Sequence, residues 1–478
     1  MFEAELFYNL LTALVGFLYI GAVVTTIAVV ILDNRNPVKT LSWVLILAFL
    51  PLVGLVLYYF FGQDTRKEKL IEKKGYVHLL KHPMREFQQQ QAFTKQDDSQ
   101  PVMRFFQNVN QSLPFAGNSV NVYTQGSEML SDLLKAIARA KHHIHLEFYI
   151  IEDDPVGRLV RDALIDKAKQ GVEVRFLYDD VGCWAIPDEF VESFLNEGIE
   201  MRSFLKVRLP HFTSKVNYRN HRKIVVIDGK IGFVGGMNLA KRYLTGLEWG
   251  RWKDLHVRIE GKAVYGLQSA FLKDWYAVDH SLITSSSYYP SIPSYGNALI
   301  QIVTSDPMGE WRDIMQGLSV IISSACSYLY IQTPYLLPTE PILWALKTAA
   351  LSGVDVRIMI PERADSRVTH WGTLSYLEEL MKAGVKIYMY QGGFLHSKLL
   401  VCDDRLSTVG STNMDFRSFE HNFEVNAFLY DHELAKQLKT IFMHDQKDAV
   451  LLKEKLWMQR PWYQKVLESV IRLLAPLL

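Results

Sequence analysis

Two long stretches without a formal charge stand at the beginning of the chain. They run over residues 6–32 and 40–63, and a polar link with Pro37 separates them. A helix needs about 20 apolar residues to cross a hydrocarbon core of roughly 30 Å, so each stretch is long enough for one crossing. The pattern therefore predicts a transmembrane hairpin of two helices.

The charges around this hairpin predict its orientation. Glu3 and Glu5 stand where a cleaved signal peptide would have Lys or Arg, and a second apolar stretch follows, so we favour an anchor over a signal peptide. Basic residues after the second stretch outnumber Arg35 and Lys39 in the link; they are Arg66, Lys67, Lys69, Lys73 and Lys74. By the positive-inside rule, both termini and the rest of the chain are expected in the cytoplasm.

The rest of the chain alternates strand-like and helical patterns twice. Strand-like runs at 143–149 and 171–177 flank a helical stretch, and runs at 328–335 and 353–359 do the same after a segment rich in Ser, Tyr and Pro. Strands that alternate with helices of this length indicate an α/β fold. We therefore expect two repeated α/β lobes. The predicted division is a transmembrane hairpin 1–63, a juxtamembrane linker 64–115, a first lobe 116–285, a second lobe 286–447 and an amphipathic helical tail 448–478.

Composition narrows the class of protein. Lys plus Arg number 52 and Asp plus Glu number 51, and the net charge of +1 gives no basic field for nucleic acid. The three cysteines, Cys183, Cys326 and Cys402, lie far apart in the sequence. This spacing argues against a disulfide framework and against a cysteine zinc site, and it fits a reducing compartment.

One polar pattern occurs once in each predicted lobe, in matching register. It reads His-x-Lys-x-x-x-x-Asp, and an Asn follows the His at the same distance in both copies. The residues are His221, Lys223, Asp228 and Asn238 in the first copy and His396, Lys398, Asp403 and Asn413 in the second. Because side chains repeat every two residues along a strand, each His and its Lys share one face. A lone strand His is usually a core residue, but two identical His–Lys pairs indicate a functional site.

These residue types suit phosphodiester chemistry. A neutral imidazole can attack phosphorus and form a covalent intermediate, while a protonated imidazole gives its proton to the leaving alkoxide. The two lysines and two asparagines would hold the non-bridging oxygens and stabilise the charged transition state. This chemistry requires no metal and no other cofactor. His142, His143 and His145 form a short cluster, but strand alternation splits them between two faces.

Two further acids, Asp254 and Glu424, occupy matching places after the two motifs. An attacking imidazole needs a carboxylate to fix its tautomer, so these acids are candidate orienting residues; ordinary surface carboxylates are the alternative. Asp228 and Asp403 belong to the repeated motif and so to the candidate catalytic set. Their place at the end of a strand suits a structural orienter better than a proton donor.

The paired motifs resemble those of the phospholipase D superfamily. Within it the chain is similar to the membrane-bound bacterial cardiolipin synthases, on Pro51-Leu-Val-Gly54, Phe61-Gly62, Thr333-Pro-Tyr335 and the ending from Arg460-Pro461 to Pro476-Leu-Leu478. The resemblance covers essentially the whole chain and implies that the two lobes share one active site. It also implies transfer of a phosphatidyl group between two phosphatidylglycerols through a phosphohistidine, giving cardiolipin and glycerol. In the superfamily the first motif commonly supplies the nucleophile, which here is His221.

The expected partners follow from this resemblance. They are an anionic phospholipid, phosphatidylglycerol, as substrate, and the cell membrane, which the chain would cross more than once with its catalytic lobes on the cytoplasmic side. No nucleic acid is expected. A hydrolase that uses water and a phosphatidyltransferase with another alcohol acceptor are the alternatives, and the oligomeric state stays open.

Two segments have a composition that suits a membrane surface. From Lys206 to Lys223 basic and apolar residues interleave without an acid, which fits a lipid headgroup contact or a solvated loop. From Trp462 onward, apolar residues at helical spacing predict an amphipathic helix. Packing against the second lobe and contact with the membrane are equally compatible with that spacing.

Overall fold

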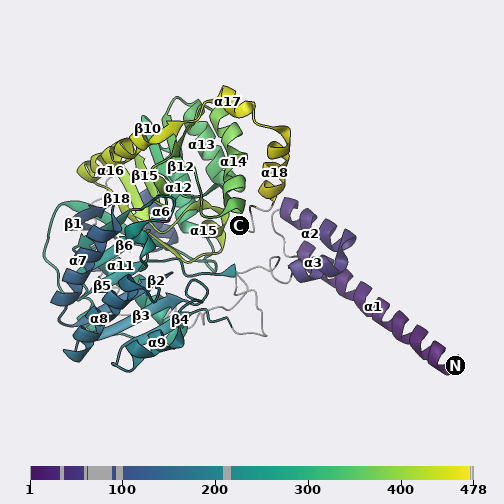
Figure 1. Ribbon diagram of the computed structural model, residues 1–478, viewed down its shortest axis with the longest axis horizontal. Coiled ribbons are helices and arrows are strands. Elements are labelled where there is room, and N and C mark those ends of the chain that lie inside the picture. Colours follow the sequence, from purple (N-terminus) through teal and green to yellow (C-terminus); the bar gives the residue numbers. More distant parts are fainter. Residues whose placement is uncertain are drawn as a thin grey trace. The chain divides into compact units, whose positions relative to one another are not determined.

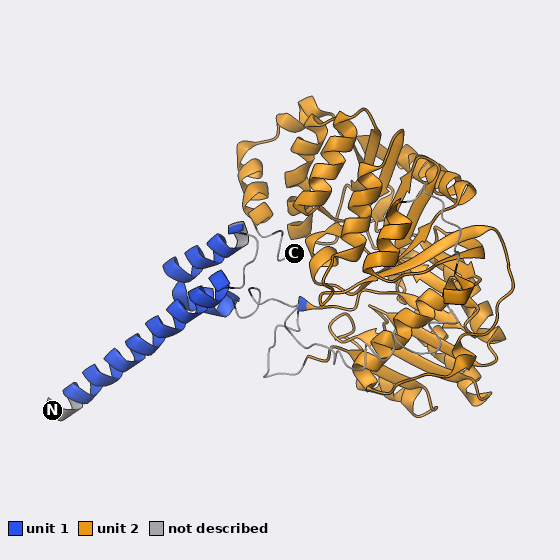
Figure 2. Ribbon diagram, turned by 180° about the vertical axis from the view of Figure 1, so that it is seen from behind, with its two compact units in different colours: residues 1–68, 208–217 blue, residues 69–207, 218–478 orange. Residues whose placement is uncertain are grey.

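The computed structural model describes residues 2–32, 37–58, 62, 89–92, 101–207, 217–473 and 475. The chain divides into two compact units, which Figure 2 colours separately. Unit 1 comprises Met1–Glu68 and Arg208–Asn217, and unit 2 comprises Lys69–Val207 and Tyr218–Leu478. The predicted linker 64–115 and the basic segment from Lys206 to Lys223 lie partly outside the described residues.

Unit 1 begins with a long apolar helix, α1 (Phe2–Leu32). Among the described residues, α1 is the one helix long and apolar enough to cross a membrane, over Glu5–Leu32. Its large apolar side chains are exposed, Phe17 for example at 76%, so burial inside the protein does not explain why the helix is so apolar. Lipid contact is the environment that suits such a helix.

The second apolar stretch differs from the single crossing helix that its composition predicts. It forms two short helices, α2 (Pro37–Phe49) and α3 (Pro51–Leu57). A Cβ on Gly54 would lie 3.0 Å from the carbonyl oxygen of Ile46, whereas eight residues of continuous helix span about 12 Å. The chain therefore turns back at Leu50, where a proline opens the new helix. At about 20 Å and 10 Å, each helix is shorter than a hydrocarbon core of about 30 Å.

Unit 2 is built on one 15-stranded sheet, with helices on both faces (Figure 1). From one edge to the other, the strands are β19 (Ala449–Leu451), β13 (Lys386–Tyr390), β12 (Asp355–Pro361), β10 (Tyr328–Gln332), β15 (Leu399–Cys402), β16 (Leu406–Gly410), β18 (Glu424–Leu429), β9 (Ala298–Ser305), β1 (Pro114–Tyr123), β8 (His256–Glu260), β6 (Ile231–Gly235), β5 (Ile224–Ile227), β2 (His143–Phe148), β3 (Glu173–Asp179) and β4 (Glu200–Phe204). Two small sheets pair β7 (Arg251–Lys253) with β14 (Gly393–Leu395) and β11 (Leu336–Leu337) with β17 (Met414–Asp415).

The strand order repeats along this sheet. In the first half β4, β3 and β2 run parallel, and β5, β6, β8 and β1 follow in antiparallel pairs. In the second half β13, β12 and β10 run parallel, and β15, β16, β18 and β9 follow in the same way. The antiparallel pair of β1 and β9 joins the two halves into one sheet. The predicted α/β fold is confirmed, and both repeats belong to one compact unit.

Helices cover the two faces of the sheet with separate apolar cores. One face packs against α7 (Gly126–Arg139), α8 (Pro155–Lys169) and α9 (Asp188–Leu195) in the first half, and against α12 (Asp313–Ser323), α13 (Glu340–Leu351) and α14 (Arg367–Lys382) in the second. The other face packs against α11 (Val264–Asp279) and α16 (His432–Asp445). Further helices of unit 2 are α6 (Pro101–Val109), α10 (Arg242–Thr245), α15 (Phe416–Glu420), α17 (Glu454–Met458) and α18 (Trp462–Leu473).

The coverage of both faces explains the apolar run after each motif. In β5, Ile224 and Val226 join the core under α11, while Val225 and Ile227 join the core under α7 and α8. A strand buried on both faces has continuous β-branched residues instead of an alternating pattern. This burial fixes β5 firmly, and the polar motif residues just before it are thereby held in place.

Candidate active site

The two motif histidines lie where the halves of the sheet meet. His221 stands just before β5 and donates its backbone N–H to the carbonyl of Phe423 at 2.9 Å. His396 stands just before β15 and donates its backbone N–H to the carbonyl of Lys253 at 2.7 Å. Each motif is therefore fastened by its backbone to a segment of the opposite half.

Each motif histidine also pairs with a carboxylate from the opposite half. Nδ1 of His221 lies 3.0 Å from Oε1 of Glu424, and Nδ1 of His396 lies 2.6 Å from Oδ2 of Asp254. All four side chains are buried. The carboxylates favour a proton on Nδ1 of each ring and leave the lone pair on Nε2. The sequence predicted both acids as orienting residues, and the structure brings each to the histidine of the other copy.

Burial sets the charge state of these pairs. Burial lowers the pKa of His221 to about 4, against the opposing effect of Glu424. Burial and the charge of Lys398 lower the pKa of His396 to about 3, against Asp254. Burial alone would raise the pKa of Glu424, but His221 and Lys223 lower it to about 2. Near neutral pH the site therefore holds two neutral imidazoles backed by two charged carboxylates.

The motif lysines lie beside the rings. Nζ of Lys398 donates to the backbone carbonyl of His396 at 2.6 Å and lies 3.0 and 3.1 Å from the two ring nitrogens. Nζ of Lys223 donates in the same way to the carbonyl of His221, at 2.5 Å. Burial lowers the pKa of Lys223 to about 7 and that of Lys398 to about 8. Buried ammonium groups close to two imidazoles are a combination of side chains that suits a phosphate group.

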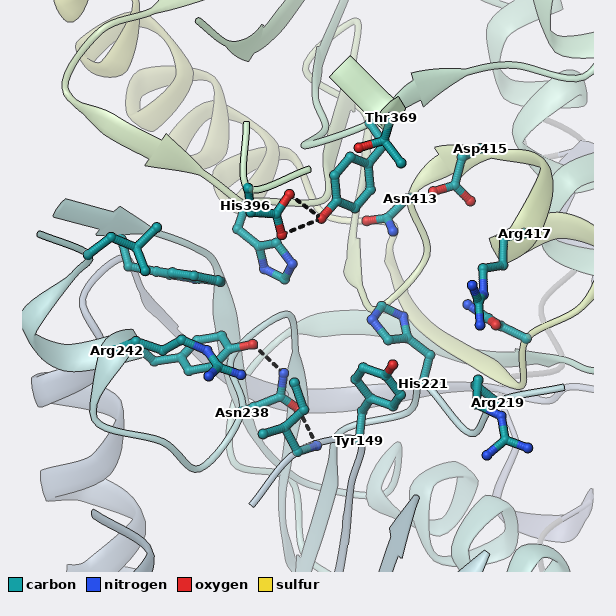
Figure 3. Close-up of a pocket in the computed structure, with 17 residues that line it drawn as sticks. Tyr149, Arg219, His221, Asn238, Arg242, Thr369, His396, Asn413, Asp415 and Arg417 are labelled. Atoms are coloured by element: carbon teal, nitrogen blue, oxygen red, sulfur yellow. Dashed lines mark hydrogen bonds between the residues drawn. The ribbon is translucent and has the colours of Figure 1, made fainter. Parts of the chain in front are cut away.

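Both imidazoles line one cavity of about 460 Å³ (Figure 3). The ring of Tyr149 lies 5.0 Å from that of His221, and the ring of Trp252 lies 5.0 Å from that of His396, measured between centroids. Arginines also line the wall: Arg219, Arg242 and Arg417. Two acids, Asp365 and Asp415, line it as well, so the cavity combines apolar ring faces with three arginines and two carboxyl groups. The arginines suit the phosphate of an anionic lipid headgroup.

The two motif asparagines line the same cavity but differ in their bonding. Asn238 is held from both sides, because its Oδ1 accepts the backbone N–H of Ile150 at 3.1 Å and its Nδ2 donates to the Tyr243 hydroxyl. Oδ1 of Asn413 is buried and has no hydrogen-bond partner within the described part of the chain. Asn413 therefore has side-chain hydrogen-bonding capacity to offer a substrate, whereas Asn238 mainly shapes the wall.

Asp228 and Asp403 do not line the cavity. The carboxylate of Asp228 accepts backbone N–H groups of residues 141–143 at 2.7–3.2 Å, and that of Asp403 accepts those of residues 326–328 at 2.8 Å. Both aspartates sit in left-handed turns, with φ of 51° and 52°. Their inclusion among the catalytic residues is not supported by this position: they fasten the loops that lead into β2 and β10.

One difference between the copies was missed at the sequence level. Ser411 donates its hydroxyl to Glu424, while the matching residue of the first copy is Gly236. A Cβ on Gly236 would lie 2.1 Å from Oδ1 of Asp254, so the glycine makes room for that carboxylate. The signal in the sequence was that Ser411 in the second motif stands where the first motif has Gly236. Asn422, which donates to Glu424 at 3.1 Å, had no such signal.

Two residues of the histidine cluster, His143 and His145, lie in β2 and belong to the core, whereas His142 just before the strand is exposed. Oε1 of Gln268 lies 3.0 Å from Nε2 of His143, and Nε2 of Gln268 lies 2.9 Å from Nδ1 of His145. Both rings are buried, and burial lowers the pKa of each. Within the described ranges, no group of three or more His, Cys, Asp or Glu side chains is arranged to hold a metal ion.

Two histidines that line one cavity, each followed two residues later by a buried lysine, on an α/β sheet with repeated strand order, define a phospholipase D-type enzyme. Comparison with known families agrees. Residues 133–275 and 318–446 match the family described as cardiolipin synthase, PLD-like domain, and residues 18–63 match the phospholipase D-nuclease N-terminal family. Among solved structures, the phosphatidylserine synthase of Haemophilus influenzae shares the fold, with a TM-score of 0.60 at 16% identity over 79% of this chain and 100% of that one.

Similarity to individual proteins narrows the class further. The chain is 41% identical over 458 residues to a cardiolipin synthase of Geobacillus sp. (strain WCH70), covering 94% of this chain and 91% of that protein. It is 39% identical over 478 residues to the major cardiolipin synthase of Bacillus subtilis (strain 168), covering 97% and 99%. The chain belongs to the cardiolipin synthase family of the phospholipase D superfamily, and it is a membrane-associated phosphatidyltransferase.

Proposed function

We propose that the enzyme transfers the phosphatidyl group of one phosphatidylglycerol to a hydroxyl of a second, through a phosphohistidine on His221. The observation that carries this proposal is the pair of imidazoles at one cavity, each backed at Nδ1 by a carboxylate of the opposite half. Lys223 and Lys398 would hold the phosphodiester oxygens between the rings. In this scheme the two related lobes, 116–285 and 286–447, each contribute half of one site.

In the first step, the lone pair on Nε2 of His221 attacks phosphorus, and the bond from phosphorus to the glycerol headgroup breaks. The leaving oxygen takes a proton from His396, so glycerol departs and the phosphatidyl group stays on His221. Glu424 stabilises the positive charge that grows on the attacking ring. The anionic phosphodiester offsets the charge of Lys398 and thereby favours the protonated form of His396 that this step needs.

The contacts of the two rings favour His221 as the nucleophile. Within the described residues, the hydrogen bonds of its ring run through Nδ1 to Glu424, which leaves the Nε2 lone pair for phosphorus. In His396, both ring nitrogens lie within 3.1 Å of the Lys398 ammonium, which competes for the lone pair. The same ammonium stands in a position to pass a proton to Nε2, as a general acid requires.

In the second step, the hydroxyl of an acceptor phosphatidylglycerol gives its proton to His396 and attacks phosphorus. The bond from phosphorus to His221 breaks and cardiolipin forms; His221 is again neutral, and His396 is again in the protonated form in which it entered the first step. Water in place of the acceptor would give phosphatidic acid, and another alcohol would give another phospholipid. The product therefore reports which acceptor the cavity admits.

Trapping the intermediate tests this scheme. Full-length enzyme mixed with phosphorus-labelled phosphatidylglycerol and quenched within the first turnover should have acid-labile, base-stable label on the peptide that contains His221. His221→Ala should take up no label, while the matched control His432→Ala, a change outside the cavity, should label normally. Label on His396 instead would reverse the two roles. No label, together with inversion at a chiral phosphorus, would exclude the two-step scheme, and phosphatidic acid as the main product would exclude the transferase assignment.

The membrane arrangement that we propose differs from a two-span hairpin. In this arrangement α1 crosses the bilayer, while α2 and α3 together enter the bilayer and leave it on the same side, because the chain turns back at Leu50. The basic residues of the link, Arg35 and Lys39, then lie on the same side as those at 66–74, with the acidic head of the chain opposite. The positive-inside rule places that shared side, and the catalytic unit, in the cytoplasm.

Labelling from outside tests this arrangement. A cysteine introduced at Phe2 should react with a membrane-impermeant maleimide on intact cells, whereas a cysteine at Leu159 in α8 of the catalytic unit should react only after lysis. Reaction of both cysteines only after lysis would restore the two-span hairpin.

A further inference from the structure

The C-terminal helix α18 packs with its polar side against the protein. Glu468 is 1% exposed and accepts from Arg460 at 2.9 Å and from Gln464 at 2.9 Å. Arg472 donates to Glu379 at 2.5 Å, and its guanidinium lies 4.2 Å from the ring of Tyr376. Both of these partners belong to α14, so ion pairs and hydrogen bonds fasten α18 to that helix.

The opposite side of α18 is apolar and exposed. The exposed fractions are 75% for Trp462, 64% for Tyr463, 52% for Val466, 51% for Val470 and 80% for Leu473. Their spacing places them on one stripe of the helix. A helix that only completed a soluble core would have the reverse orientation, with this stripe buried and the ion pairs in water. Because the polar contacts to α14 hold the helix in register, the stripe stays exposed.

We propose that this exposed stripe docks on the surface of an anionic phospholipid bilayer. Trp462 and Tyr463 have rings that favour the interface between headgroups and acyl chains, and the aliphatic residues behind them can enter the boundary by about 5–10 Å. In the sequence before α18, Lys453 and Lys455 flank Glu454, so this segment has one net positive charge, which complements anionic lipid. A second protein copy would need more surface, since a standard interface uses about 20–30 residues on each side.

The place of α18 links this surface to the catalytic cavity. It packs along α14, as Figure 1 shows, and Thr369 near the start of α14 lines the cavity. A bilayer held against α18 is therefore separated from the cavity wall by one helix. The inference extends the proposed function, because it says how a site for lipid headgroups is brought to the lipid surface; the binding itself does not depend on the phosphohistidine.

A fluorescent label on the stripe tests the docking directly. In the background Cys326→Ser, which removes the exposed thiol and leaves the two buried ones, Val470→Cys is labelled with an environment-sensitive fluorophore. Leu159→Cys in α8, an apolar position of similar exposure at 48%, is the matched control. The full-length proteins are reconstituted into phosphatidylglycerol-containing vesicles with lipids that have a quencher on the acyl chain.

The label at position 470 should be blue-shifted and quenched several-fold more strongly than the label at position 159. Equal, weak quenching at both positions would overturn the proposal. Shielding at position 470 without lipid quenching, combined with disulfide cross-linking between copies, would also overturn it in favour of a dimer contact. Failure to trap label on His221 would leave this readout unchanged, so the two proposals fail separately.

A kinetic comparison gives a second readout. The double variant Val466→Ser with Val470→Ser removes apolar side chains from the stripe and leaves the ion pairs to α14 intact. Its turnover of phosphatidylglycerol in vesicles should fall at least about fivefold, because less apolar surface leaves water on docking. Turnover of a short-chain phosphatidylglycerol dispersed as monomers should not change. Equal losses on both substrates would contradict a docking role for the stripe.

Discussion

Each motif histidine pairs with a carboxylate from the opposite half of the sheet, an arrangement that we call the crosswise pairing. Replacing Glu424 by Gln isolates the electrostatic part of this pairing. The carboxylate is fully buried: Nδ1 of His221 lies 3.0 Å from its Oε1 and 3.1 Å from its Oε2, Oε1 also accepts from Asn422, and Oε2 accepts from Ser411. A glutamine whose carbonyl replaces Oε1 keeps the bonds of that oxygen to His221 and Asn422 and loses the longer contact of Oε2 with His221. Its amide can donate to Ser411, because that hydroxyl rotates to accept. The substitution therefore preserves shape and removes one negative charge.

The size of the effect follows from the distance. Two unit charges about 4 Å apart interact by about 4 kcal/mol at an effective dielectric constant of about 20. If the attacking ring of His221 has gained about half a charge in the transition state, removing the carboxylate charge costs about 2 kcal/mol, or about 30-fold in kcat. Because the neutral ring of the resting enzyme interacts far less with that charge, KM should change little.

The assay measures cardiolipin by mass spectrometry from full-length enzyme with phosphatidylglycerol in mixed micelles. Glu433→Gln, the same substitution at a position of α16 whose side chain is 82% exposed, is the matched control and should retain wild-type kcat. Thermal unfolding of both variants confirms that the fold is intact. A loss of kcat below about threefold, or a change confined to KM, would refute the view that Glu424 acts on the charge of the attacking ring.

The remaining predictions concern pH, a strand-end aspartate and a buried acid. The ratio kcat/KM should fall above neutral pH as Lys223 and Lys398 lose their protons, because burial lowers their pKa values to about 7 and about 8. The variant Lys398→Arg stays charged and should show a smaller fall. A kcat/KM that stays constant through alkaline pH would contradict this prediction. Asp403→Asn should destabilise the fold by about 1–3 kcal/mol in denaturant unfolding and leave kcat unchanged. Backbone N–H groups lower the pKa of Asp403 despite its burial, so the stability that its carboxylate contributes is present above the ordinary carboxyl pKa and is lost as pH falls. A variant that is destabilised equally at neutral and at low pH would contradict this role of Asp403. Glu147→Gln should keep activity and raise the unfolding temperature at alkaline pH. Burial raises the pKa of Glu147, so the folded state is stabilised by the protonated form and loses this stability as pH rises through that pKa, whereas Gln has no proton to lose. An inactive variant, or one that unfolds at a lower temperature, would contradict this prediction. The matching residue Gln332 already donates an amide to Asp445 at 3.0 Å.

The sequence alone located the residues of the site but not their partners. The repeated motifs identified His221 and His396, and the spacing behind them identified Asp254 and Glu424. The pairing of each acid with its histidine depends on two contacts between the halves of unit 2. One is the pairing of β7 with β14, and the other is the bridge between Asn220 and Phe423. Such pairings between distant segments leave no periodic signal, since periodicity reports only which face of one element is buried.

The two apolar ends of the chain show a similar limit. Composition cannot distinguish one helix of residues 40–63 from two helices that turn at Leu50, because a proline is tolerated at the first turn of a new helix. In α18 the spacing predicted the amphipathic helix but not the side that packs. That choice follows from ion pairs to α14, Arg460 with Glu378 and Arg472 with Glu379, which hydrophobic spacing does not encode.

The crosswise pairing also bears on how the chain tolerates change. A chain with a single copy of the motif would need a second chain to complete the site, because each pair takes its histidine from one copy and its acid from the other. Within one chain the copies are free to differ, as they do at Glu147 and Gln332 and at Gly236 and Ser411. The presence of two copies nonetheless provides no redundancy. Loss of either copy removes one member of each histidine–carboxylate pair, so neither copy can substitute for the other.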